Sequence, residues 1–214
     1  MVGPYAVMTD RHVAAEFSRA EDAGWNFQQG MSARFDPGEE LPAHQAPGLV
    51  PAPSSLPYEL VEVVEVVEVI GIHPEVAMVL LRIAPPNSEE PPTPLAVAAD
   101  APASVPAGPC MSSVSPRGTA RRNEPESMRR ILMDLYNGKR LQPGTTTEFT
   151  PGGRVTNHDC SPLGGNSGSP VLDLTDHRIL GLHFGGRYRI GNVAVPLWEL
   201  VDDPLLAQAR VRGV

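Results

Sequence analysis

Residues 158–186 read HDCSPLGGNSGSPVLDLTDHRILGLHFGG, and this stretch decides the fold. It centres on Ser167, which has one glycine two residues before it and another directly after it. Acyl transfer by a serine needs an exposed Oγ and backbone N–H groups that face the developing oxyanion, and glycines allow the tight turn that presents both. A plain glycine- and serine-rich loop would read similarly. The nucleophile elbow G-x-S-x-G is excluded, because Ser169 stands where its last glycine should be.

A serine nucleophile also needs a general base, and the candidate is His12. It lies in VMTDRHVAAEF, residues 7–17, directly after a short apolar run. The order of histidine before serine is that of chymotrypsin-type enzymes. A single histidine is most often a surface or a satisfied core residue, so His12 becomes a candidate base only through its pairing with the Ser167 loop.

These two segments resemble those of bacterial trypsin-like serine peptidases. Residues 7–17 are similar to the family's V-[LM]-T-[NA]-x-H-V segment, and residues 163–170 are similar to its G-N-S-G-S-P nucleophile loop. The resemblance reaches glutamyl endopeptidases and a bacterial subgroup with a C-terminal AVPLWEL-like helix. It is strong over about residues 5–18 and 157–204 and weak between them.

The resemblance implies a role for each of these residues. Ser167 would be the nucleophile, His12 the base, and the backbone N–H groups of Gly165 and Ser167 the oxyanion hole. The hairpin after Ser167 would form one wall of the S1 pocket, whose lining residues would be Ser161, His183 and Gly185. In glutamyl endopeptidases a histidine matching His183 contacts an acidic P1 side chain, but relatives without that preference share it, so P1 specificity stays open.

The third triad position departs from the family. Such families carry the orienting aspartate in a segment like H-P-x-x-D-[VMI]-[AV]-L-L-R, and residues 73–82 read HPEVAMVLLR, with Ala77 at the aspartate position. Loss of that carboxylate typically costs about 10⁴ in kcat, so we expect weakened activity. Glu75 is a weak substitute, because its carboxylate would have to move roughly 6–7 Å along a strand.

Short strand candidates, few helices and many turns predict an all-β fold. We expect two six-stranded-type antiparallel barrels of the chymotrypsin-like kind with a short C-terminal helix. The chain begins nine residues before Asp10, without the G-x-G-F-like segment that precedes the histidine strand in the family, so we expect a first barrel truncated at its N-terminus. Either this is a natural minimal form or the true start lies upstream. The expected parts are 1–83 (first half), 84–109 (proline-rich crossing segment), 110–195 (second half) and 196–214 (C-terminal helix).

Two local expectations accompany this fold. Residues 13–23 suit a helix directly after His12. Residues 58–74, YELVEVVEVVEVIGIHP, place glutamates three residues apart in a valine-rich run, which matches neither a good helix nor a simple pleat. That run predicts two short strands, or one strand with a bulge or bend.

Charge and hydropathy limit the partners. The 214 residues carry a formal net charge of −8, which argues against nucleic acid, because phosphate binding needs a basic surface. No run approaches the roughly 20 apolar residues of a membrane span, so no membrane partner is expected. The resemblance implies a protein or peptide substrate, and the oligomeric state stays open.

Cysteine content and the start of the chain bear on location. Cys110 and Cys160 are too few for a disulfide-stapled secreted domain, although a disulfide between them stays open. The start, MVGPYAVMTD, lacks signal-peptide features, so we expect the cytoplasm, unless an upstream segment hides a leader. His158 and Cys160 form an H-x-C pair, too short a ligand set for structural zinc, and no metal or cofactor is expected.

Two functions of different classes remain open. The first is a serine endopeptidase of impaired activity, and the alternative is a catalytically inactive protease-like module for binding or regulation. Ala77 favours the alternative. The retention of both Ser167 and His12 favours the enzyme, because a site released from catalysis has no reason to keep them, and we expect the enzyme.

Overall fold

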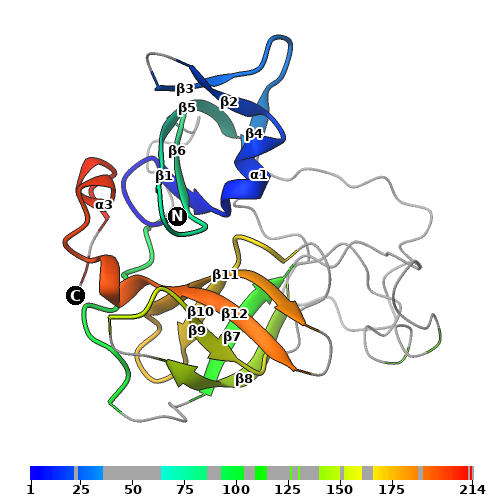
Figure 1. Cartoon of the computed structure of the whole chain (residues 1–214), viewed down its shortest axis with the longest axis vertical. Coiled ribbons are helices and arrows are strands. Elements are labelled where there is room, and N and C mark those ends of the chain that lie inside the picture. The colour runs from blue at the N-terminus through cyan, green and yellow to red at the C-terminus, as the bar shows by residue number, and fades with distance from the viewer. Residues whose placement is uncertain are drawn as a thin grey trace.

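The computed structural model describes residues 1–21, 24–35, 64–85, 93–103, 109–114, 126, 130, 140–149, 152–160, 166–187, 190–211 and 213. Two antiparallel β-sheet halves lie against each other, one built from the start of the chain and one from its later part (Figure 1). The all-β prediction is therefore confirmed.

The second half is a closed six-stranded antiparallel barrel with strand order β10-β11-β12-β9-β8-β7. Its strands are β7 (Pro109–Val114), β8 (Arg140–Phe149), β9 (Thr156–His158), β10 (Pro170–Asp173), β11 (Ile179–Arg187) and β12 (Gly191–Pro196). The hairpin β10–β11 follows Ser167 directly, as the sequence predicts. Closure leaves this barrel without a free edge, so the Ser167 loop enters a rigid frame.

The first half is a curled sheet with strand order β1-β6-β5-β4, plus a separate hairpin of β2 and β3. Its strands are β1 (Ala6–Thr9), β2 (Ser18–Glu21), β3 (Gly24–Phe27), β4 (Ala33–Phe35), β5 (Val64–Ile72) and β6 (Val79–Ile83). Among the described residues this half does not close into a barrel. β1 pairs with β6, so the strand before His12 lies beside the strand that follows Ala77.

β5 explains the glutamates that recur every third residue. The pairing of β5 with β6 shifts register between Val66 and Glu68, and again between Val69 and Gly71. The first shift leaves Val67 and Glu68 both exposed and returns Val69 to the core. A bulge therefore reconciles a period of three with a pleat, and the prediction of one bulged strand is confirmed.

The helix after His12 is shorter than predicted. α1 spans Arg11–Ala15, and β2 begins at Ser18, so the expectation of a helix over residues 13–23 is wrong. Phe17 and Phe27 stack with ring centroids 5.6 Å apart, and the Gln28 N–H donates to the Phe17 carbonyl at 2.9 Å. Pairing with β3 thus overrides the local helical pattern.

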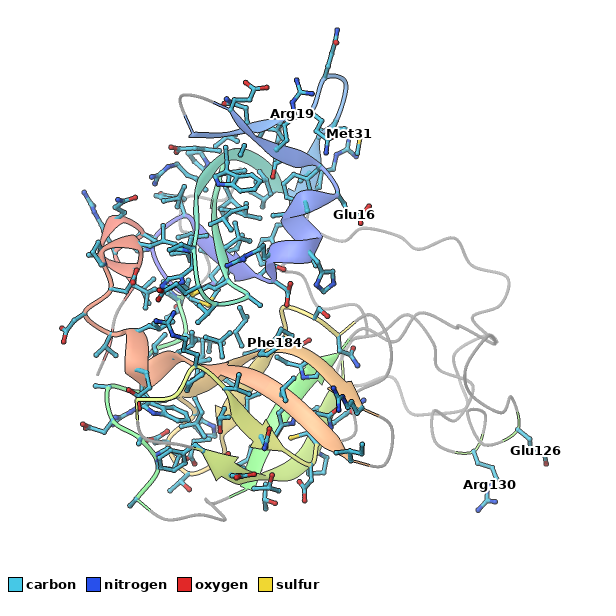
Figure 2. All side chains as sticks on the ribbon, viewed as in Figure 1. Glu16, Arg19, Met31, Glu126, Arg130 and Phe184 are labelled. Carbon is cyan, nitrogen blue, oxygen red and sulfur yellow. The ribbon has the colours of Figure 1, made fainter. Side chains whose placement is uncertain are left out.

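One hydrophobic core joins the two halves. Its buried members come from both halves, from the segments that flank their strands and from the C-terminal segment: Val2, Ala6, Val76, Met78, Leu80, Val97, Ile179, Leu182, Val195, Leu197, Leu206 and Ala209. Phe184 packs against this core from β11 and lies at the junction of the halves (Figure 2). The relative position of the two sheets, and of the side chains between them, is therefore fixed by packing.

The C-terminal segment contains two short helices rather than one. A 3₁₀ turn, η2, covers Leu197–Leu200, and α3 covers Pro204–Gln208, with Asp203 as its N-cap. In the described part of the chain, no helix is long and apolar enough to cross a bilayer. Between residues 114 and 140 the structure describes only Glu126 and Arg130, and both are helical.

Candidate active site

His12 projects from the first turn of α1. Asp10 is the N-cap of this helix, with extended backbone angles of φ −77° and ψ 149°, and its Oδ1 accepts the backbone N–H of His12 at 2.8 Å. The imidazole side chain is 62% exposed, and its Nδ1 lies 2.6 Å from the same Oδ1. Nδ1 is therefore engaged, and Nε2 is the nitrogen left for a substrate or a nucleophile.

The Ser167 loop is a tight turn held by β11. The Ser169 N–H donates to the Asn166 carbonyl at 3.0 Å, the Gly168 N–H to the His183 carbonyl at 2.8 Å, and the His183 N–H to the Ser169 carbonyl at 2.9 Å. Gly168 has φ +92°, which L side chains rarely adopt, and Ser167 is partly exposed. The glycine after the serine is thus required by the turn, as the sequence predicts.

The structure brings the histidine segment and the serine turn together. A Cβ placed on Gly168 would collide with Thr9 Oγ1 and would lie 3.3 Å from the backbone nitrogen of Asp10. The residue after Ser167 is therefore in van der Waals contact with the junction of β1 and α1. His12 is two residues after Asp10, so the segment that carries His12 and the turn that carries Ser167 are neighbours between the halves.

The candidate S1 wall holds two buried histidines. His183 is 5% exposed and His158 is 1% exposed, and His158 Nε2 lies 3.0 Å from His183 Nδ1. Burial, and then the neighbouring His183, lower the pKa of His158 to about 4, although Asp159 opposes the shift. Burial also lowers the pKa of His183 to about 4, opposed by Asp10. Both imidazoles are therefore neutral at neutral pH.

His158 belongs with His183 in the candidate pocket wall, a neighbour that the sequence reasoning did not assign. It lies on β9 opposite Asn192 of β12, and His183 lies on β11 opposite Ala194 of the same strand. Only the strand order β11-β12-β9 makes the two histidines neighbours, and no local motif signals that order.

The other predicted pocket and oxyanion residues are placed in part. Gly185 follows His183 on β11, at a shift in the register with β12. Ser161 and Gly165 lie outside the described residues, so their roles stay predictions, as does the pairing of Cys110 and Cys160, because the side chain of Cys110 is not described.

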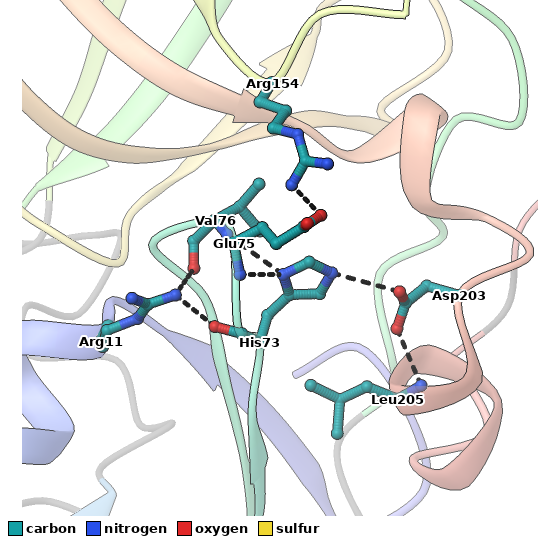
Figure 3. A network of polar contacts seen from close by, with 7 residues as sticks. All are labelled: Arg11, His73, Glu75, Val76, Arg154, Asp203 and Leu205. Atoms are coloured by element: carbon teal, nitrogen blue, oxygen red, sulfur yellow. Dashed lines mark hydrogen bonds and ion pairs between the residues drawn. The ribbon is translucent and has the colours of Figure 1, made fainter.

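Hydrogen bonds hold the segment that carries Ala77 beside α1 (Figure 3). Arg11 Nη2 donates to the carbonyl of His73 and, at 2.6 Å, to the carbonyl of Val76. His73 Nδ1 accepts the N–H groups of Glu75 and Val76, each at 3.1 Å, and its Nε2 lies 3.2 Å from Asp203 Oδ2. Ala77 comes directly after Val76, whose carbonyl accepts a hydrogen bond from Arg11, the residue before His12. The alanine supplies no carboxylate at this place.

Glu75, the weak substitute for the missing aspartate, has a different partner. Its carboxylate forms an ion pair with Arg154 of the second half, and both side chains are more than half exposed (Figure 3). The carboxylate found at His12 is instead that of Asp10. The sequence carried a signal for it, because the family segment has Asn or Ala where this chain has Asp10.

Comparisons with known proteins agree with this architecture. A family model described as a trypsin-like peptidase domain matches residues 1–182. No curated protein matches the chain.

Solved structures of bacterial proteases are similar in fold. The Rv3671c protease from M. tuberculosis in its active form is 18% identical, with a TM-score of 0.56 over 100% of this chain and 74% of that one. Its inactive form is 18% identical, with a TM-score of 0.52 over 98% and 81%. A Glu endopeptidase in complex with MPD is 14% identical, with a TM-score of 0.54 over 92% and 77%. At these identities the likeness establishes the chymotrypsin-like double-barrel fold.

Proposed function

Because the chain belongs to the trypsin-like peptidase domain family, we propose that it is a serine endopeptidase that hydrolyses peptide bonds through an acyl-enzyme at Ser167. The observation that carries the proposal is the contact between the Ser167 turn and the β1–α1 junction, which sets the serine segment beside the histidine segment. Protein or peptide chains are the substrate class that this family implies.

In this proposal, the Ser167 Oγ attacks the carbonyl carbon of the scissile bond while Nε2 of His12 takes the hydroxyl proton. The resulting oxyanion accepts hydrogen bonds from the backbone N–H groups of Gly165 and Ser167. The C–N bond then breaks, and His12 gives the proton to the departing amine. Water, deprotonated by His12, attacks the acyl-enzyme, and the proton returns to Ser167 as the acid product leaves.

Ala77 bears on the rate of this reaction. A carboxylate on Nδ1 holds the imidazole in one tautomer and stabilises the imidazolium, and its loss costs about 10⁴ in kcat. Because the segment around Ala77 supplies no such group, we propose that turnover is slower than in a relative with a complete triad unless another carboxylate takes this role at Nδ1.

The pocket wall also suggests a substrate contact. His183 is buried, neutral at neutral pH and next to the turn that holds Ser167. We propose that its ring contacts the P1 side chain, with His158 supporting it through the bond between the two imidazoles.

The test is cleavage of a proteome-derived peptide library by wild type and by Ser167→Ala. We expect new peptide termini with wild type, grouped by a shared P1 residue, and none above background with Ser167→Ala. Circular dichroism confirms that both proteins are folded. A folded wild type that produces no new termini would instead favour the binding or regulatory module.

A further inference from the structure

Asp10 is a buried carboxylate with an incomplete set of partners. The residue is 2% exposed. Its Oδ1 accepts the backbone N–H of His12 and lies 2.6 Å from the ring Nδ1, whereas its buried Oδ2 has no hydrogen-bond partner among the described residues. Burying a charge is costly unless it is paired and fully hydrogen-bonded, so a buried carboxylate with one unpartnered oxygen needs an explanation.

Helix capping does not explain this charge. Asn and Ser cap an α-helix about as well as Asp, because capping needs only a side-chain oxygen that accepts a backbone N–H. Either would satisfy the N–H of His12 without placing a carboxylate in the core. α1 is also only five residues long, so the favourable interaction of an anion with a helix dipole is small here.

The surroundings of Asp10 contain one partner that becomes cationic during the reaction. The guanidinium of Arg11 is directed to the carbonyls of His73 and Val76 rather than to Asp10. The charge of Asp10 raises the pKa of His183, but burial outweighs it and lowers that pKa to about 4, so His183 is neutral at neutral pH. Among these neighbours, His12 is therefore the group whose developing positive charge Asp10 can stabilise.

The alanine at position 77 is consistent with a role for Asp10, because it leaves Asp10 without a competing carboxylate at the imidazole of His12. Two carboxylates against one imidazole would repel each other, and like charges at short range are unfavourable. This chain has an alanine where the family resemblance predicts an aspartate, and it has an aspartate two residues before the histidine, where the family has Asn or Ala. Compared with the family pattern, this chain keeps one carboxylate for the imidazole and carries it at position 10 in place of position 77.

We propose that Asp10 is the positioning residue for His12, in place of the aspartate that is absent at position 77. The inference rests on the proposed function. Asp10 accepts the Nδ1–H of the imidazole at Oδ1, which leaves Nε2 unprotonated and free to accept the proton of Ser167. It then stabilises the imidazolium without taking its proton.

The test compares cap-preserving variants of Asp10. Asp10→Asn and Asp10→Ser keep an acceptor for the His12 backbone N–H but remove the carboxylate. We expect kcat on a library-derived peptide to fall by about 10²–10⁴, with KM changed less than about threefold. Glu16→Gln is the matched control, because it removes an exposed acid at the end of α1 remote from the second half (Figure 2), and kcat should be unchanged.

Relocating the carboxylate gives the sharpest result. In Asp10→Asn with Ala77→Asp, an aspartate returns to the position expected from the family resemblance, and we expect at least about tenfold recovery of kcat over Asp10→Asn. A merely structural role for Asp10 predicts no such recovery. Folded Asp10→Asn and Asp10→Ser proteins with wild-type kcat would overturn the proposal.

A readout that does not need activity separates the two proposals. In Ser167→Ala protein, NMR should show a low-field proton on Nδ1 of His12, and Asp10→Asn should remove it. If wild type cleaves nothing while this resonance is present, the proposed function fails and the Asp10–His12 contact stands. Absence of the resonance overturns the positioning role.

Discussion

Replacing His12 with alanine is expected to lower kcat by about five to six orders of magnitude. Removing the base of a serine peptidase costs nearly as much as removing the whole set of reacting groups, because the groups act as a unit. The side chain is 62% exposed, so the free energy of unfolding should change by less than about 1 kcal/mol. Kinetics on one library-derived peptide, with urea unfolding of both proteins, measures the two effects.

His177→Asn is the control for this variant. His177 is exposed in the β10–β11 hairpin and has φ +62°, a conformation that Asn tolerates well. This variant should retain wild-type kcat. A His12→Ala enzyme within tenfold of wild type would mean that another group removes the proton from the nucleophile.

Acidification is expected to destabilise the protein through the buried pair of His158 and His183. Their pKa values are about 4 in the folded protein and near 6.5 in an unfolded chain, so the unfolded state binds protons first as the pH falls. Stability contributed by the neutral pair is complete above about pH 6.5 and is lost progressively between pH 6.5 and pH 4. One histidine with this shift corresponds to roughly 3 kcal/mol.

Urea unfolding at several pH values between 7.5 and 4 measures this loss. Asp10 and Asp159 are the carboxylates that act on the two rings, and both oppose the shifts. The double variant His158→Gln with His183→Gln should show a flatter dependence of the free energy of unfolding on pH. His177→Asn should follow wild type. Equal losses in wild type and in the double Gln variant would show that other groups cause the acid sensitivity.

Features set by local sequence were predictable. The turn at Ser167 needed a glycine at position 168, and the hairpin β10–β11 followed from two apolar runs with a polar turn between them. The glutamate spacing in β5 likewise indicated a bulge, because no regular strand accommodates a period of three. In each case neighbouring residues carry the information.

Features set by tertiary contacts were not predictable. The length of α1 depended on the pairing of β2 with β3, and the neighbour of His183 depended on which strand lies next to β12. Glu75 faces Arg154, which is 79 residues away in the sequence. Asp10 is an intermediate case, since its departure from the family segment is visible in the sequence, but its burial against His12 is visible only in the fold.

Covalent labelling tests the central claim most directly. A fluorophosphonate reacts with a serine only when a base and an oxyanion hole activate it. Intact-protein mass spectrometry with peptide mapping should find one adduct, on Ser167, formed by wild type and by His177→Asn, absent from Ser167→Ala and much slower in His12→Ala. Folded wild-type protein that forms no adduct, or an adduct at another serine, would contradict the assignment of this site as a serine peptidase centre.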